Sequence, residues 1–63
     1  MRLAVLELGS QWGLYHVTEP NETHRLLERC QSNMQAEEEA IALSNLLASV
    51  EDPQEFIQGL YID

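Results

Sequence analysis

Apolar side chains recur at helical spacing over residues 36–50, the longest strongly periodic stretch of the chain. Four of them follow a 3-4-3 spacing that places them on one stripe of an α-helix: Ala40, Leu43, Leu47 and Val50. Two neighbouring stripes are also apolar, formed by Ile41 with Ala48 and by Ala42 with Leu46. We therefore expect a helix that is apolar over much of its circumference and packs against more than one neighbour.

Two strands are predicted before this helix. Residues 2–8 are apolar on both faces, and residues 12–18 are rich in aromatic and β-branched types. The intervening Gly9-Ser10-Gln11 supplies turn residues, so the two segments predict a β-hairpin with a loop of about three to five residues. An isolated hairpin is unstable in water, and one of its faces must therefore pack on the helices.

The segment after the hairpin predicts another helix, introduced by Glu19-Pro20-Asn21 and running from Glu22. Its apolar stripe consists of Leu26, Leu27, Cys30 and Met34. The polar run Gln31-Ser32-Asn33 leaves two alternatives. A break there gives two antiparallel helices, the second capped by Ser32 or Asn33; without a break, one helix covers residues 22–50. The break is preferred for a monomer, in which so long a helix has too little to pack on, and a homodimer reverses that preference.

The sequence Glu51-Asp52-Pro53 ends the periodic segment, with Asp52 as cap and Pro53 as the first residue of a short helix. This helix offers Phe56 and Ile57 to the core and ends at Gly59, and residues 60–63 could add a short strand. The predicted fold class is α+β, as one small domain over residues 1–63. An N-terminal β-hairpin packs on an acidic two-helix hairpin, or on one long helix, with a short C-terminal helix.

The charge of the chain is strongly one-sided. Eleven acidic residues stand against three arginines and no lysine, which gives a formal net charge of −8 in 63 residues. This charge argues against direct binding to nucleic acid or to an anionic membrane, since both need cationic side chains. It favours a protein partner with a basic surface, or an acidic surface that imitates a nucleic-acid backbone. A chain of this length buries so little surface that its stability is marginal on its own, which favours binding to a partner or formation of a homodimer.

The N-terminal apolar run is too short for a signal peptide or a membrane span, and the single cysteine excludes an internal disulfide. We therefore expect a cytoplasmic protein. No catalytic, cofactor-binding or metal-binding residue is predicted. Cys30 and His24 point to different sides of the predicted helix, and His16 and His24 lack the ligand spacing of metal sites. We expect a protein that is not an enzyme.

Candidate interaction residues remain. Trp12, Tyr15 and Tyr61 could anchor an interface, because aromatic residues dominate binding hot spots. The acidic triplet Glu37-Glu38-Glu39 suits the first turns of a helix, where the helix dipole favours negative charge. Apolar residues on both faces of the first strand favour contact of one face with another chain.

The leading hypothesis is a non-enzymatic interaction module that binds a larger protein. In type, a hairpin followed by acidic helices resembles small accessory or inhibitory proteins of phages and mobile elements. The alternative is a nucleic-acid mimic that inhibits a basic DNA- or RNA-binding protein, using six acids: Glu37, Glu38, Glu39, Glu51, Asp52 and Glu55. A second alternative is a small ligand- or metal-responsive regulator.

Overall fold

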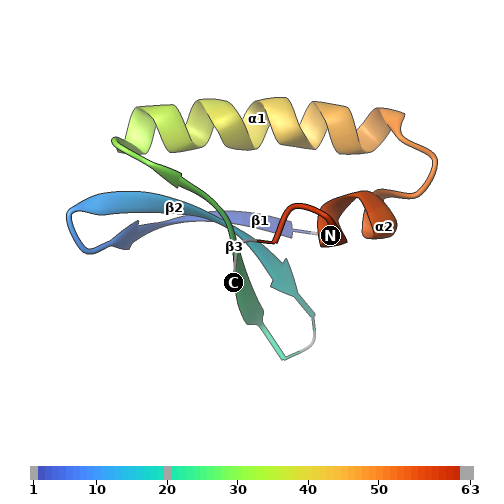
Figure 1. Ribbon diagram of the computed structural model, residues 1–63, viewed down its shortest axis with the longest axis horizontal. Helices are drawn as coiled ribbons and strands as arrows, with labels where there is room; N and C mark the ends of the chain where they lie inside the picture. Colours follow the sequence, from blue (N-terminus) through green and yellow to red (C-terminus); the bar gives the residue numbers. More distant parts are fainter. Residues whose placement is uncertain (1, 20, 62–63) are drawn as a thin grey trace.

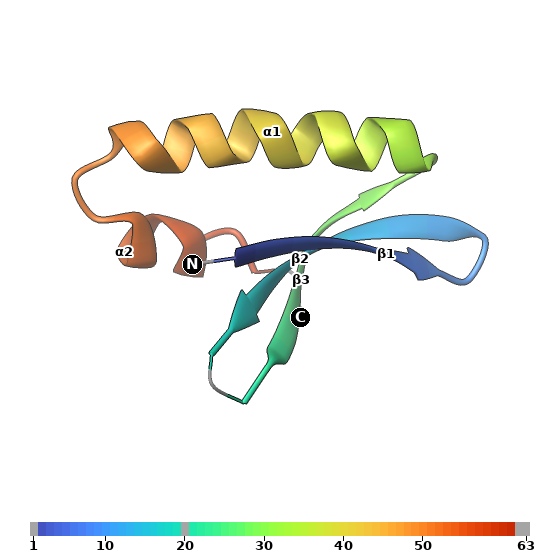
Figure 2. The same ribbon diagram turned by 180° about the vertical axis from the view of Figure 1, so that it is seen from behind.

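A three-stranded sheet with a long helix across one face forms the protein. The computed structural model describes residues 2–19 and 21–61. Within these residues the elements are β1 (Arg2–Leu8), β2 (Gln11–Thr18), β3 (Thr23–Cys30), α1 (Asn33–Ser49) and α2 (Pro53–Gln58). The sheet is antiparallel with strand order β1-β2-β3, and α1 lies along one side of it in both views (Figure 1, Figure 2). The predicted α+β class is confirmed.

The N-terminal hairpin of β1 and β2 is confirmed. The two strands pair from Arg2 with Val17 to Leu8 with Gln11, so the turn consists of two residues and is shorter than predicted. Gly9 has a φ of 64°, a conformation that glycine adopts without steric cost. Glycine at the first central position is what a type II′ turn needs, and such turns match the twist of paired strands.

The predicted first helix is wrong, because Thr23–Cys30 forms β3, antiparallel to β2. Leu27 is the extra residue of a β-bulge opposite Leu14 and Tyr15. The bulge places Leu27 and Cys30 on the same side of the sheet at a separation of three, which imitates helical spacing. As a third strand, this segment stabilises the β1-β2 hairpin, which would be unstable alone. As a helix, it would gain only a few tenths of a kcal/mol from each pair of side chains one turn apart.

Helix α1 begins where the polar run predicted a break, so a single helix over residues 22–50 is also wrong. Ser32 is the N-cap: its hydroxyl accepts a hydrogen bond from the Gln35 amide at 3.1 Å. The Gln35 side chain in turn accepts one from the Gln31 amide at 2.9 Å. The bond to Ser32 satisfies one of the amides that the first helical turn leaves without a partner, and the bond to Gln31 ties the preceding residue to the helix. At Val50 the backbone is extended, which ends the helix.

Helix α2 begins as predicted. The Asp52 carboxylate accepts a hydrogen bond from the Glu55 amide at 3.2 Å, Pro53 is the first helical residue, and Gly59 is the C-cap. Leu60 and Tyr61 do not form the suggested C-terminal strand, and the rest of that prediction lies outside the described residues, as does Pro20. Helix α2 lies beneath the C-terminal end of α1, beside the start of β1 (Figure 1, Figure 2).

The core lies between α1, α2 and the sheet. Its buried cluster consists of Leu14, Leu27, Leu47 and Ile57. The predicted inward stripe of α1 holds, since Ala40, Leu43 and Leu47 all contact this cluster or belong to it. Ala36 is fully buried at the start of that stripe, and small side chains there allow the helix to approach the sheet closely.

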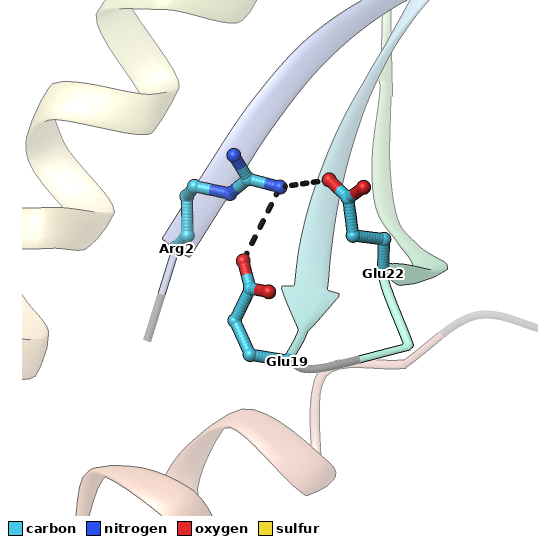
Figure 3. Close-up of polar contacts among 3 residues, drawn as sticks. All are labelled: Arg2, Glu19 and Glu22. Atoms are coloured by element: carbon cyan, nitrogen blue, oxygen red, sulfur yellow. Dashed lines mark hydrogen bonds and ion pairs between the residues drawn. The ribbon is translucent and has the colours of Figure 1, made fainter.

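An ion-pair cluster joins the start of β1 to the loop between β2 and β3 (Figure 3). The Arg2 guanidinium lies 2.9 Å from the Glu22 carboxylate and 3.5 Å from that of Glu19. All three side chains are more than half exposed, so the pairs contribute little free energy. Glu22 has a φ of 49°, which is uncommon for a residue other than glycine, and its bond to Arg2 helps to fix this turn.

Candidate functional site

The predicted aromatic anchors do not form one surface. Trp12 and Tyr15 are three residues apart on β2, so they lie on opposite faces of the sheet. Trp12 is half-buried on the face covered by α1, opposite Cys30. Tyr15 lies on the open face, where a Cβ added to Gly13 would come within 2.7 Å of its ring. Tyr15 therefore covers the middle of the open face, together with His24, whose ring makes an edge contact with it.

The third predicted anchor, Tyr61, is tied to the sheet. Its hydroxyl and His16 Nδ1 form a hydrogen bond of 2.7 Å, and the two rings stack at 6.0 Å between centroids. The Arg25 guanidinium carbon lies 3.9 Å from the centre of the Tyr61 ring. His16 is 4% exposed, and this burial lowers its pKa, with the positive charge of Arg25 adding to the effect. These contacts tie Tyr61 to the sheet at the end of the described chain.

The acidic triplet is divided between two sides of α1. Since α1 begins at Asn33, the triplet lies in the second turn and not in the first, where the helix dipole is strongest. Glu37 is exposed beside Leu3 of β1, and Glu38 is exposed as well. Glu39 is half-buried on the other side of the helix, above β3. The three carboxylates are therefore not equivalent, and only Glu39 reaches a concave surface of β3.

That concave surface, which we call the β3 groove, was not predicted. Helix α1 packs on β1 and β2 more than on β3, which leaves a groove of about 370 Å³ between α1, β3 and α2. Its described lining is apolar except for two glutamates: Leu14, Leu27, Glu28, Glu39, Ala42, Leu43, Leu46, Phe56 and Leu60. Leu46 is 45% exposed at the rim, as expected for one of the outer apolar stripes noticed in the sequence.

Glu28 is the perturbed carboxylate of the β3 groove. Burial raises the pKa of Glu28 above its ordinary value, and the charge of Glu39 raises it further. Cys30 is nearby: burial raises the pKa of its thiol, and Glu28 and Glu39 add to that shift. A thiol in such surroundings stays protonated and is a poor nucleophile. The groove is thus a partly desolvated apolar surface with two carboxylates, not a reactive cysteine site.

A second recess is polar. It measures about 660 Å³ and lies at the other end of β2, near Tyr61 and α2. Its described lining is His16, Val17, Thr18, Glu19, Arg25, Gln54, Gln58 and Tyr61. Three of these side chains already contact one another: His16 and Tyr61 form a hydrogen bond, and Arg25 stacks on Tyr61. The β3 groove is lined mainly by apolar side chains, whereas this recess is lined mainly by polar ones, so the β3 groove is the stronger candidate for binding an apolar segment.

Among residues 2–19 and 21–61, no group of three or more His, Cys, Asp or Glu side chains is placed to hold a metal ion. The helices of that part of the chain are too short or too polar to cross a membrane. Comparison with protein families, curated proteins and solved structures finds no match to this chain.

Proposed function

We propose that this protein is a non-enzymatic interaction module that binds a segment of a larger protein through the β3 groove. The observation that carries the proposal is the groove itself, an apolar concavity between two helices and a strand in a chain of only 63 residues. Apolar concave surfaces with a few polar groups are the usual docking sites for anchoring side chains. Leu46 and Phe56 supply walls from two different helices, as in grooves that take an amphipathic helix.

The proposed partner has a basic surface around the segment that enters the groove. The net charge of −8 supports this, because it attracts basic surfaces and repels acidic ones. A cytoplasmic protein that accompanies or inhibits a larger protein, of the kind that phages and mobile elements carry, fits this proposal. A homodimer is compatible with it, since Leu6 is 44% exposed on the open face of the sheet, away from the groove.

The test compares a charge introduced on the groove side of α1 with the same charge introduced on the opposite side of that helix. Leu46→Glu puts a carboxylate in the β3 groove, whereas Ile41→Glu puts the same charge on the far side of the same helix, where the side chain is 64% exposed. Proteins captured by the wild-type chain from a lysate of its own cells are identified and purified, and their affinities for the three chains are measured by calorimetry. Equal circular-dichroism melting curves show that both variants fold.

We expect Leu46→Glu to weaken binding at least tenfold and Ile41→Glu to change it less than threefold. A partner that binds Leu46→Glu as tightly as wild type contradicts the proposal.

The same measurement at 50 and 500 mM salt distinguishes this proposal from nucleic-acid mimicry, which would use exposed acids such as Glu37, Glu38 and Glu51. Mimicry requires most of the affinity to be lost at 500 mM salt, whereas binding through the β3 groove keeps the part that comes from apolar contact and stays sensitive to Leu46→Glu at that salt concentration. A ligand- or metal-responsive regulator instead requires a melting temperature that rises with added ligand or metal.

A further inference from the structure

Two carboxylates interrupt an otherwise apolar groove. Glu28 comes from β3 and Glu39 from α1, so they approach the β3 groove from different elements. Both residues are half-buried. Placing two like charges near apolar surface costs free energy, and this cost falls when a cation lies between them.

The arginines of the chain lie elsewhere. Arg2 pairs with Glu19 and Glu22 at the opposite end of the sheet. Arg25 stacks on Tyr61. Arg29 follows Glu28 directly but pairs with Gly13, which places its side chain on the open face of the sheet. None of the three is among the described residues that line the β3 groove, and the chain contains no lysine.

We infer that the β3 groove takes an amphipathic segment whose apolar side chain fills the concavity and whose neighbouring lysine or arginine lies between Glu28 and Glu39. The inference rests on the proposed function and specifies the chemistry of the partner. Charge complementarity carries it: the groove presents two carboxylates beside apolar walls, and a cationic side chain next to an apolar one matches both features. An ammonium or guanidinium group bound by two carboxylates forms charge-assisted hydrogen bonds, which are stronger than neutral ones.

The chain offers a matched control. Glu28→Gln with Glu39→Gln removes both groove carboxylates, whereas Glu37→Gln with Glu38→Gln removes two exposed ones from the same region. Each double variant changes the formal net charge from −8 to −6, so general attraction to a cation changes equally. At 0.15 M salt, charges farther apart than about 8 Å are largely screened, which limits the effect of the exposed pair.

The probes are two peptides of 12 residues with four leucines at helical spacing. In one peptide the polar positions are lysine, and in the other they are glutamine. Nitrogen-proton NMR spectra locate each peptide on the protein, and titration gives its Kd for the wild-type chain, the two double variants and Leu46→Glu.

We expect the lysine peptide to shift the resonances of groove residues and to bind wild type about tenfold more tightly than the glutamine peptide does. The preference should vanish in the Glu28→Gln/Glu39→Gln variant and persist in the Glu37→Gln/Glu38→Gln variant.

Three results overturn the inference. Equal loss in both double variants means that the attraction is general. If both peptides bind the wild-type groove equally and Leu46→Glu abolishes that binding, the inference fails while the proposed function stands. If neither peptide shifts groove resonances and Leu46→Glu binds the purified natural partner normally, both fail.

Discussion

Removal of the Ile57 side chain tests whether α2 is held in place by the core. Ile57 is the buried residue of α2, is 0% exposed, and packs with Leu14, Leu27 and Leu47. Replacing a buried isoleucine by alanine typically costs about 2–5 kcal/mol, because apolar contacts are lost and a cavity remains. A chain of this length has a free energy of unfolding of about 3–9 kcal/mol, so Ile57→Ala should remove around half of it.

The measurement is urea unfolding followed by circular dichroism. With an m-value of about 1 kcal/mol/M for so small a protein, the midpoint of Ile57→Ala should fall by about 2 M or more. Ile57→Val should cost only about 0.5–1.5 kcal/mol. Gln58→Ala, which changes an exposed residue of the same helix, should stay within about 0.5 kcal/mol of wild type. If Ile57→Ala is no less stable than Gln58→Ala, α2 is not docked and the β3 groove lacks one of its walls.

Two further predictions follow from the pKa shifts of buried groups. The pKa of His16 is lower in the folded protein than in the unfolded chain, where it is about 6.5. Between these two pKa values the unfolded chain binds more protons than the folded protein does. Stability that is fully present above pH 6.5 is therefore lost as the pH falls through this window. Wild type should therefore lose more stability than His16→Gln between pH 7.5 and 5.5 in urea titrations; parallel losses would show that His16 does not bind its proton on unfolding. Cys30 is 2% exposed with a raised pKa, so it should react with an aromatic disulfide reagent at least a hundredfold more slowly in the native protein than in 8 M urea, and equal rates would contradict its burial.

Much of the fold was predictable because it is encoded by local signals. Gly9-Ser10 permits a tight turn, Ser32 caps α1, and Asp52-Pro53 begins α2, and each acts through its own or neighbouring backbone. Strand β3 was not predictable in this way. Leu26 and Leu27 face opposite sides of the sheet, and the bulge then brings Cys30 to the side of Leu27, so the apolar pattern lacks the strict alternation of a strand.

The candidate site was largely hidden for the same reason. Glu28 lines the same groove as Glu39 because its segment is a strand beside α1, whereas the sequence predicted a helix for that segment. The outer stripe of Ala42 and Leu46 was visible in the sequence, but the concavity beneath it depends on the docking of α2. Trp12 and Tyr15 were correctly placed on one strand, and period-two alternation separates them onto two faces.

The bulge in β3 also governs how the sheet meets other chains. With strand order β1-β2-β3, neither outer strand pairs with a further strand among residues 2–19 and 21–61, and an open strand edge invites strand addition and aggregation. The edge of β3 is bent by its bulge and carries three charged side chains, Arg25, Glu28 and Arg29. The edge of β1 has no bulge in its pairing, and between Leu3 and Leu6 it carries no charge. The edge of β3 is therefore protected against addition of a strand from another chain, and the edge of β1 is not. Arg2 and Glu7 flank the uncharged part of β1, and their charges oppose such pairing.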